Sequence, residues 1–388
     1  MAEKEGPRAE GRGHRGGTGY IPRPAALGPG ALALDIARVS ICPYRLPLRQ
    51  PWISARGRLD AREGWLVAVT ADGIWGYGDC APLPEAGTEP PALAAQALGE
   101  HRACLPGLAL AEALERLDRD AARTPAAAWA LECALLDLAS RRRALPLRTL
   151  LAPEASSRVP VNAALGALAD LDDTDAMRAA VAGFRVLKLK VGLADPAWEL
   201  ARLARLAERL PAGIGLRLDA NGAWDKPAAT RFLDGLGDLP VECLEEPLRE
   251  ADPAALAELQ SRVRFALALD ESLSRGADAL DPARFPVRRA VLKPAALGGL
   301  RRTLELARTL QGAGIEIVVT SLVDSAAGLW PTAQLAAAIG SPVAQGLATA
   351  HWLARDLGAA PQPENGRLSL PDRPGSGFAP AAPSALNR

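Results

Sequence analysis

Residues 186–192 read VLKLKVG, a short apolar run that contains two lysines. Lysine is rare elsewhere: the chain has five, at positions 4, 188, 190, 226 and 293, although Lys and Arg together number 45. Arginine stays protonated in proteins, whereas burial and nearby positive charge can lower the pKa of a lysine until it acts as a base. A lysine at a strand end can also simply reach water or pair with a carboxylate. Because this chain otherwise prefers arginine, we favour a chemical role.

Between Lys190 and Lys293, three more apolar runs end in acidic residues. They are GLRLDANG (215–222) with Asp219, VECLEEPL (241–248) with Glu245 and Glu246, and FALALDES (265–272) with Asp270 and Glu271. The intervals from Lys190 through Asp219, Glu245 and Asp270 to Lys293 are 29, 26, 25 and 23 residues. Each interval fits one strand, one helix and two short loops. Segments between the runs, such as 198–210, carry apolar residues at helical spacing. The pattern predicts parallel strands covered by helices.

The run that holds Lys293, AVLKPAALGG (290–299), is the fifth of the series. Three further strand-like runs extend the repeat to eight strands: VPVNAALG (159–166), IEIVVTSLV (315–323) and SPVAQGLA (341–348). Eight β/α steps favour a closed barrel, and an open doubly wound sheet is the alternative. The charged residues decide between the two, because only closure brings the C-terminal ends of five successive strands around one pocket. We therefore predict an α/β fold, a modified TIM (β/α)-barrel.

The rest of the chain predicts a second domain, as its length of 388 residues suggests. Residues 1–32, rich in Gly, Arg and Pro, resemble a disordered leader without the apolar core of a signal peptide. Residues 33–155 combine alternating strand-like runs, with a turn at ADG (71–73), and helical segments, which predicts an α+β capping domain. The barrel would span 156–352. The tail, 353–388, would fold back to complete the capping domain.

Composition restricts the partners. The 45 basic residues balance 45 acidic ones, so no electrostatic footprint for nucleic acid or an anionic membrane is present. No apolar stretch reaches the length of a membrane span. Five scattered cysteines without a CxxC motif disfavour disulfides and a zinc site, and three distant histidines disfavour a Ser-His-Asp triad. We expect a cytoplasmic protein that acts on a small-molecule carboxylate.

The acids at the strand ends predict a metal site. Carboxylates from three adjacent strands, without a His or Cys ligand, offer only oxygen atoms, which suit Mg²⁺, with Mn²⁺ as a substitute, better than Zn²⁺. Acidic residues also favour the first turns of helices, but that does not explain the ordered set. A divalent cation between lysines, with room for a substrate carboxylate, is suited to removing the proton next to that carboxylate.

A capping domain followed by the motifs LKLKVG, LDANG, LEEPL, LDES, LKPAALGG and PGSG resembles the enolase superfamily in its muconate-lactonizing-enzyme-like branch, and the resemblance covers about residues 33–380. The resemblance implies a base, Lys190, a neighbouring helper, Lys188, and a lysine across the pocket, Lys293. It also implies three metal ligands, Asp219, Glu245 and Asp270, with Arg217 and Asn221 as polar support.

Within that branch, YRLPLRQPW (44–52), AREGWLVAV (61–69) and GYGDCAPLP (76–84) resemble the o-succinylbenzoate synthases of menaquinone biosynthesis. TSLVDSAAGL (320–329) resembles their penultimate strand, so Thr320 and Ser321, together with Gly298 of the LKPAALGG motif, are predicted to contact or support the substrate. Asp79 and Asp324 stand where such sequences usually have Glu, which leaves their roles open. Residues 52–62 are expected to close over the substrate.

The resemblance implies a hydro-lyase that converts 2-succinyl-6-hydroxy-2,4-cyclohexadiene-1-carboxylate to 2-succinylbenzoate with Mg²⁺. An N-succinylamino acid racemase and a dipeptide epimerase are alternatives. Dipeptide epimerases of this branch carry an Asp-x-Asp motif on the last strand, and SPVAQGLATAHW (341–352) has none. A barrel that binds a carboxylate without turning it over is the remote alternative.

Overall fold

The computed structural model describes residues 34–54, 57–276 and 280–381, so the predicted leader lies outside the described residues. Its larger sheet contains eight parallel strands, which confirms the predicted repeat. They are β4 (Arg158–Ala167), β5 (Val186–Lys190), β6 (Gly215–Asp219), β7 (Val241–Glu245), β8 (Ala266–Leu269), β9 (Arg289–Leu292), β10 (Glu316–Val319) and β11 (Gln345–Ala348). Neighbours in the chain are neighbours in the sheet, and β11 returns to pair with β4. A parallel bridge between Thr320 and Gly346 joins β10 to β11 and nearly closes the barrel.

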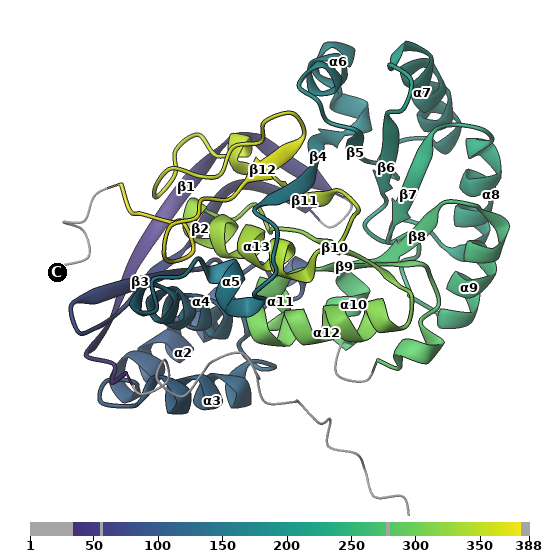
Figure 1. Cartoon of the computed structure of the whole chain (residues 1–388). Coiled ribbons are helices and arrows are strands. Elements are labelled where there is room, and N and C mark those ends of the chain that lie inside the picture. The colour runs from purple at the N-terminus through teal and green to yellow at the C-terminus, as the bar shows by residue number, and fades with distance from the viewer. Residues whose placement is uncertain (1–33, 55–56, 277–279, 382–388) are drawn as a thin grey trace, which may run out of the picture.

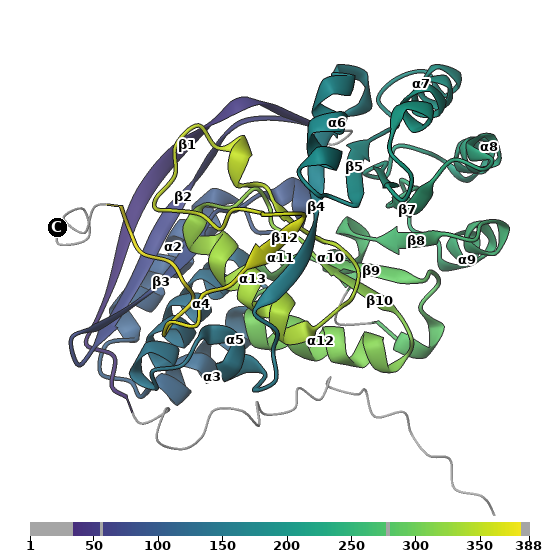
Figure 2. The same ribbon diagram turned by 45° about the horizontal axis from the view of Figure 1, so that its top comes forward.

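Helices cover the outside of this barrel (Figures 1 and 2). They are α6 (Asp173–Val181), α7 (Pro196–Arg209), α8 (Lys226–Leu236), α9 (Pro253–Arg262), α10 (Glu271–Gly276), α11 (Pro294–Leu297), α12 (Leu300–Gly312) and α13 (Ala326–Ile339). Helices α7, α8 and α9 begin in the same way, with a capping Asp followed by a proline in the first turn. The Asp side chain accepts hydrogen bonds from backbone N–H groups that the helix itself leaves unpaired. Proline suits the first turn because the N–H that it lacks would have no partner within the helix. These local signals set where each helix starts.

The second sheet is the antiparallel meander β1 (Arg38–Ser54), β2 (Gly57–Ala71) and β3 (Ile74–Cys80). The predicted turn joins β2 to β3, with Asp72 and Gly73 at φ of 49° and 76°; two left-handed residues are typical of a tight hairpin turn. Helices α2 (Pro91–Cys104), α3 (Leu110–Asp120), α4 (Pro125–Arg142) and α5 (Leu147–Leu151) follow. Helix α4 is buried from Pro125 to Ser140 and packs on β3. These elements form the predicted α+β cap.

The C-terminal segment runs back past β1 and α13 (Figure 1). Strand β12 (Arg367–Ser369) pairs antiparallel with β4 of the barrel. Beyond it, Gly375 O accepts from Leu147 N at 2.9 Å and Ser376 N donates to Asp137 Oδ1 at 2.5 Å, so the tail contacts the cap as well. The predicted boundary near residue 155 falls between α5 and β4, and the division into domains stays a prediction. Within the described residues, no helix is both long and apolar enough to cross a bilayer.

Candidate active site

A pocket of about 190 Å³ lies at the C-terminal ends of the barrel strands. The cap supplies one wall: Trp52, Gly57, Arg58 and Leu59 come from the β1–β2 hairpin, and Leu83, Glu85 and Ala86 come from the segment after β3. Strands β1 and β2 reach the barrel because they are 17 and 15 residues long. These four hairpin residues are the part of the segment 52–62 that lines the pocket, and residues 55 and 56 lie outside the described residues. Arg62 does not line the pocket: it is buried and donates to the carbonyls of Ala81 and Pro82.

The three predicted metal ligands converge on this pocket. Each of Asp219, Glu245 and Asp270 is buried and offers a carboxylate oxygen, and these three oxygens lie within 4.8 Å of one another. Asp219 and Glu245 are directly paired across β6 and β7, and Asp270 follows β8. Glu246 fixes the third ligand by accepting a hydrogen bond from Asp270 N at 2.7 Å. Three adjacent strands thus present three carboxylates to one point.

Electrostatics at this triad fit a bound cation. Burial raises the pKa of Asp270 well above its ordinary value, and the neighbouring charge of Glu271 adds to the rise. Burial would also raise the pKa of Asp219, but the ammonium groups of Lys188 and Lys190 hold it below its usual range. Glu245 Oε1 is buried without a hydrogen bond. A crowded, buried, oxygen-only set with an unused acceptor suits Mg²⁺.

Lys188 lines the pocket beside two of the acids. Its Nζ contacts Glu245 Oε2 and lies 3.0 Å from Asp219 Oδ2. Burial alone would lower the pKa of Lys188, but Asp219 and Glu245 raise it above the ordinary value. Lys188 therefore stays charged and lies closest to two predicted ligands, consistent with the predicted helper role.

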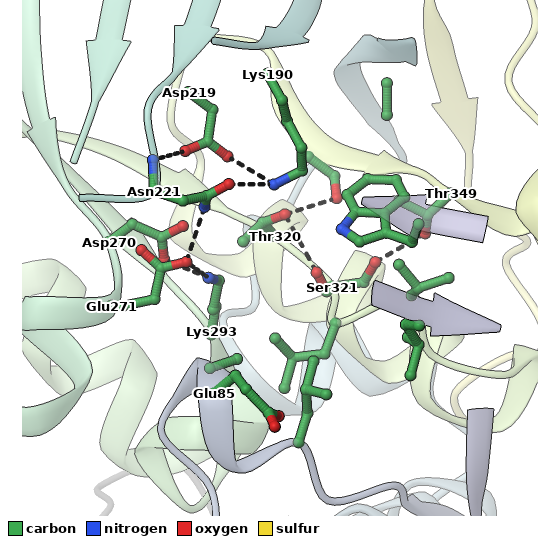
Figure 3. A pocket seen from close by; sticks show the side chains of 18 of the residues that line it. Glu85, Lys190, Asp219, Asn221, Asp270, Glu271, Lys293, Thr320, Ser321 and Thr349 are labelled. Atoms are coloured by element: carbon green, nitrogen blue, oxygen red, sulfur yellow. Dashed lines mark hydrogen bonds and ion pairs between the residues drawn. The ribbon is translucent and has the colours of Figure 1, made fainter. Parts of the chain in front are cut away.

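Lys190 lies further out, beside groups that leave its charge weakly compensated (Figure 3). Its Nζ donates to Asn221 Oδ1, lies 3.6 Å from Asp219 Oδ2 and stands 5.2 Å from the ring centroid of Trp52. Burial lowers the pKa of Lys190, and the opposing effect of Asp219 does not restore it because Lys188 and Lys293 repel the charge. The side chain is thus favoured as a base.

Lys293 faces Lys190 from the other side of the barrel. It follows β9, four strands along the sheet from β5 in a ring of eight. Its Nζ lies 2.7 Å from Asp270 Oδ1 and 3.3 Å from Glu271 Oε1. Burial would lower the pKa of Lys293, but these two acids raise it above the ordinary value. The two opposing lysines therefore differ: the surroundings of Lys293 favour its charged form, whereas those of Lys190 favour loss of the proton.

Asn221 connects the two lysines through Glu271 (Figure 3). Lys190 donates to its Oδ1, and its Nδ2 donates to Glu271 Oε1 at 3.0 Å. Asn221 adopts φ of 46°, a left-handed conformation that asparagine tolerates. Arg217 lies outside the pocket lining, where Nε pairs with Glu242 at 2.6 Å and approaches Glu245 at 3.7 Å. These contacts are consistent with polar support by both residues, which stays a prediction.

The predicted substrate contacts divide into two groups. Thr320 and Ser321 line the pocket; Thr320 Oγ1 donates to Gly346 O at 3.0 Å, and Ser321 Oγ shares a 2.7 Å hydrogen bond with Thr349 (Figure 3). Gly298 lies outside the lining. A Cβ at Gly298 would stand 2.8 Å from Ala121 O, so this glycine allows close contact between the barrel and the cap. Gly298 therefore supports the fold rather than touching a ligand.

Asp79 and Asp324 lie behind the pocket, where the cap meets the barrel. Asp79 accepts from Tyr44 and from the N–H and hydroxyl of Ser325, at 3.0 and 2.8 Å, which ties β3 to the start of α13. Asp324 Oδ2 accepts from Leu322 N at 3.2 Å and shapes the turn that presents Ser321 to the pocket. Both carboxylates are buried and outside the pocket lining. Their contacts indicate structural roles.

Asp324→Asn should stabilise the protein above pH 6. Burial, then the charge of Asp79, raises the pKa of Asp324 from 3.8 to about 6. The folded state disfavours the charged form, so stability is lost as pH rises between these values, and the cost persists at higher pH. We expect the free energy of unfolding to increase by up to about 3 kcal/mol at pH 8 and little at pH 4. Urea unfolding at both pH values measures this difference; an equal gain at both would show that ionisation of Asp324 is not the cause.

Sequence patterns do not reveal the contacts of Glu271 and Trp52. Glu271 follows a strand, but its position between Asn221 and Lys293 is visible only in three dimensions. Trp52 lies on Lys190 and packs edge-on against Trp352 with centroids 4.6 Å apart. No local pattern marks such a contact, because it joins the cap to the segment that follows β11.

Comparisons with known proteins agree with this geometry. The model of the enolase C-terminal domain-like family matches residues 172–384, and the model of the MenC N-terminal domain matches residues 36–138. The o-succinylbenzoate synthase of Yersinia enterocolitica is 31% identical over 297 residues, covering 76% of this chain and 84% of the relative. The L-Lys-D/L-Arg epimerase of Methylococcus capsulatus is 30% identical over 358 residues, covering 89% of this chain and 99% of the relative.

The fold likeness extends over nearly the whole described chain. The structure of muconate lactonizing enzyme from Pseudomonas fluorescens, complexed with muconolactone, superposes with a TM-score of 0.83 at 25% identity, covering 91% of this chain and 98% of that one. This similarity agrees with the predicted muconate-lactonizing branch. From the matched C-terminal domain, the relatives at 30% identity or more and the converging strand-end residues, we conclude that the chain belongs to the enolase superfamily.

Proposed function

We propose that the protein is an o-succinylbenzoate synthase, which removes water from 2-succinyl-6-hydroxy-2,4-cyclohexadiene-1-carboxylate to give 2-succinylbenzoate. The observation that carries this proposal is the unequal environment of the opposing lysines. Lys190 faces a neutral amide and has a lowered pKa, whereas Lys293 lies between two carboxylates and stays charged. A dehydration needs one base and benefits from one fixed cation, and this arrangement supplies both.

In the proposed reaction, the substrate carboxylate lies at the acidic triad and the ring proton next to it points at Lys190. When bound there, Mg²⁺ supplies positive charge that stabilises the negative charge developing on the carboxylate oxygens. Lys190 takes the proton. In a syn elimination the leaving hydroxyl is on the same face, so the Lys190 ammonium can return that proton and water departs. The electron pair of the broken C–H bond completes the aromatic ring.

The other side chains hold the substrate and the charge. Lys293 remains an ammonium on the opposite face of the ring, where it attracts negative charge and the π-system. Asn221 holds Lys190 by accepting one of its hydrogens. Thr320, Ser321 and Thr349 offer hydroxyl groups at the barrel end of the pocket, where the succinyl carboxylate would lie. Trp52 and Leu59 of the cap would exclude water from the ring.

The direct test is turnover of the cyclohexadiene by the purified protein with Mg²⁺, followed by the ultraviolet change that accompanies aromatisation. Purified protein that produces 2-succinylbenzoate supports the proposal. A protein that binds the carboxylate without turning it over would instead fit the remote alternative of a non-catalytic barrel.

Racemisation of an N-succinylamino acid is the second candidate. The observation in its favour is that Lys190 and Lys293 lie four strands apart, so a base could approach either face of an enolate. The similarity to an epimerase is as high as the similarity to a synthase. Dipeptide epimerisation has less support, because β11 and Thr349 contribute no acidic side chain to the pocket lining, where a dipeptide ammonium group would need one.

Substitutions of Lys293 separate the two chemistries. Lys293→Arg keeps the cation, so we expect measurable dehydration, while Lys293→Ala should reduce kcat by about a further tenfold or more because the fixed charge is lost. Racemisation would be abolished by both, since arginine cannot act as the second base. Steady-state rates of the two variants on the cyclohexadiene measure this. Equal loss in both variants would contradict an electrostatic role for Lys293.

A further inference from the structure

The segment after Lys293 is built as one stiff unit. The Lys293 carbonyl accepts hydrogen bonds from Ala296 N and Leu297 N, both at 2.9 Å, and Pro294 begins α11 directly after the lysine. Proline fixes the backbone angle at that position. All four residues of α11 are buried. A displacement of α11 would therefore move the backbone of Lys293 with it.

The far end of this unit rests on the cap. Helix α11 packs against α4, and Gly298 approaches Ala121 so closely that a Cβ would stand 2.8 Å from its carbonyl oxygen. Gly298 has φ of 87°, a left-handed conformation that favours glycine. At the next position, a Cβ on Gly299 would overlap Glu132 Oε2. Glu132 thus occupies the space that a side chain at Gly299 would need.

Glu132 caps the helix that follows. Helix α12 begins at Leu300 after Gly299, which offers no capping side chain. Glu132 Oε1, from the middle of α4, accepts from Arg301 N at 3.1 Å and from Arg301 Nε at 2.8 Å. Arg301 also pairs with Asp118 of α3 at 2.7 Å. By contrast, α7, α8 and α9 are each capped by an aspartate that directly precedes them. A carboxylate at a helix start satisfies free N–H groups and the helix dipole.

We propose that Glu132 is a positioning residue for Lys293, which it holds in place through the segment 294–301. Glu132 is 3% exposed and belongs to the cap, so the cap fixes a lysine of the barrel as well as covering the pocket. The inference rests on the proposed function only for what Lys293 does. A misplacement of about 1 Å can lower a rate by about a hundredfold, so small movements of α11 matter.

Lysine NMR tests the proposal without a substrate. Because the chain has five lysines, protein labelled with ¹³C at lysine Cε gives few signals, and the Lys293→Arg variant assigns the one from Lys293. We expect Glu132→Ala to shift the Lys293 signal while the Lys226 signal stays in place. Asp137→Ala is the matched control: Asp137 is a buried acid on the same helix, but it accepts hydrogen bonds from Ser376 N of the tail, Tyr77 N of β3 and Arg141 Nε instead. This control should leave the Lys293 signal unchanged.

Kinetics supply the second readout. We expect Glu132→Ala to lower kcat for dehydration by about tenfold to a hundredfold with little change in KM. Glu132→Gln keeps an acceptor oxygen for Arg301 and should retain most of the activity. An unshifted Lys293 signal with a normal kcat in Glu132→Ala would overturn the positioning role of Glu132 and leave the synthase proposal intact. If the Lys293 signal shifts in Glu132→Ala but the wild type does not dehydrate the cyclohexadiene, the positioning role of Glu132 is confirmed and the synthase proposal is refuted.

Discussion

Replacing Lys190 with arginine is expected to lower the rate of dehydration by about a thousandfold or more. Arginine keeps the positive charge and nearly the same reach, but its guanidinium does not give up a proton in a protein. The variant therefore removes the base and preserves the charge near Asp219 and Asn221. Steady-state kinetics on the cyclohexadiene, with circular dichroism to check the fold, measure the effect.

Lys226→Arg is the matched control for this substitution. Lys226 is an exposed lysine at the start of α8, where it pairs with Glu258 away from the pocket. We expect it to keep the wild-type rate. If Lys190→Arg retains more than about a tenth of that rate, a barrier change below about 1.4 kcal/mol, another group is the base.

Removal of the metal is expected to abolish activity, and Glu245→Gln should weaken Mg²⁺ binding by more than about tenfold. The substitution exchanges one carboxylate of the buried triad for an amide of the same shape, so the site loses charge but little volume. Lys188 keeps its partner Asp219 at 3.0 Å, which favours an intact fold. Isothermal titration with Mg²⁺ measures binding, and activity after EDTA treatment measures the requirement.

The control for the metal site is Glu258→Gln, which removes an exposed carboxylate on α9. It should leave the affinity for Mg²⁺ unchanged. Added Mg²⁺ should also raise the melting temperature of the wild type, because an ion that binds the folded state stabilises it. Full turnover in metal-free buffer would contradict the assignment of Asp219, Glu245 and Asp270.

The sequence was sufficient to predict the barrel because its signals are local and repeated. Five successive strands, β5 to β9, end in an ionisable residue or are followed directly by one, at nearly constant spacing. The parallel arrangement then brings Lys190 and Lys293 to one face. The unequal environments of these two lysines were not predictable. They depend on Asn221 and Glu271, whose contacts join segments 22 to 50 residues apart.

Contacts between the cap and the barrel could not be predicted from the sequence either. Glu132 caps α12 across a separation of 169 residues, and Asp79 holds Ser325 across 246. Neither partner follows from helical or strand periodicity, because such contacts depend on how the cap docks. The GG pair at 298–299 was visible as a motif, but its reason, the close approach of Ala121 and Glu132, appears only in the fold.

We propose that the protein is a dehydratase in which Lys190 is the one base. The most direct measurement compares kcat/KM for the cyclohexadiene with kcat/KM for deuterium exchange on either enantiomer of an N-succinylamino acid in D₂O. We predict efficient formation of 2-succinylbenzoate and slow or absent exchange, because Lys293 stays protonated between Asp270 and Glu271. Rapid deuterium incorporation with inversion, at an efficiency equal to or above that for the cyclohexadiene, would contradict the account and make racemisation the main activity.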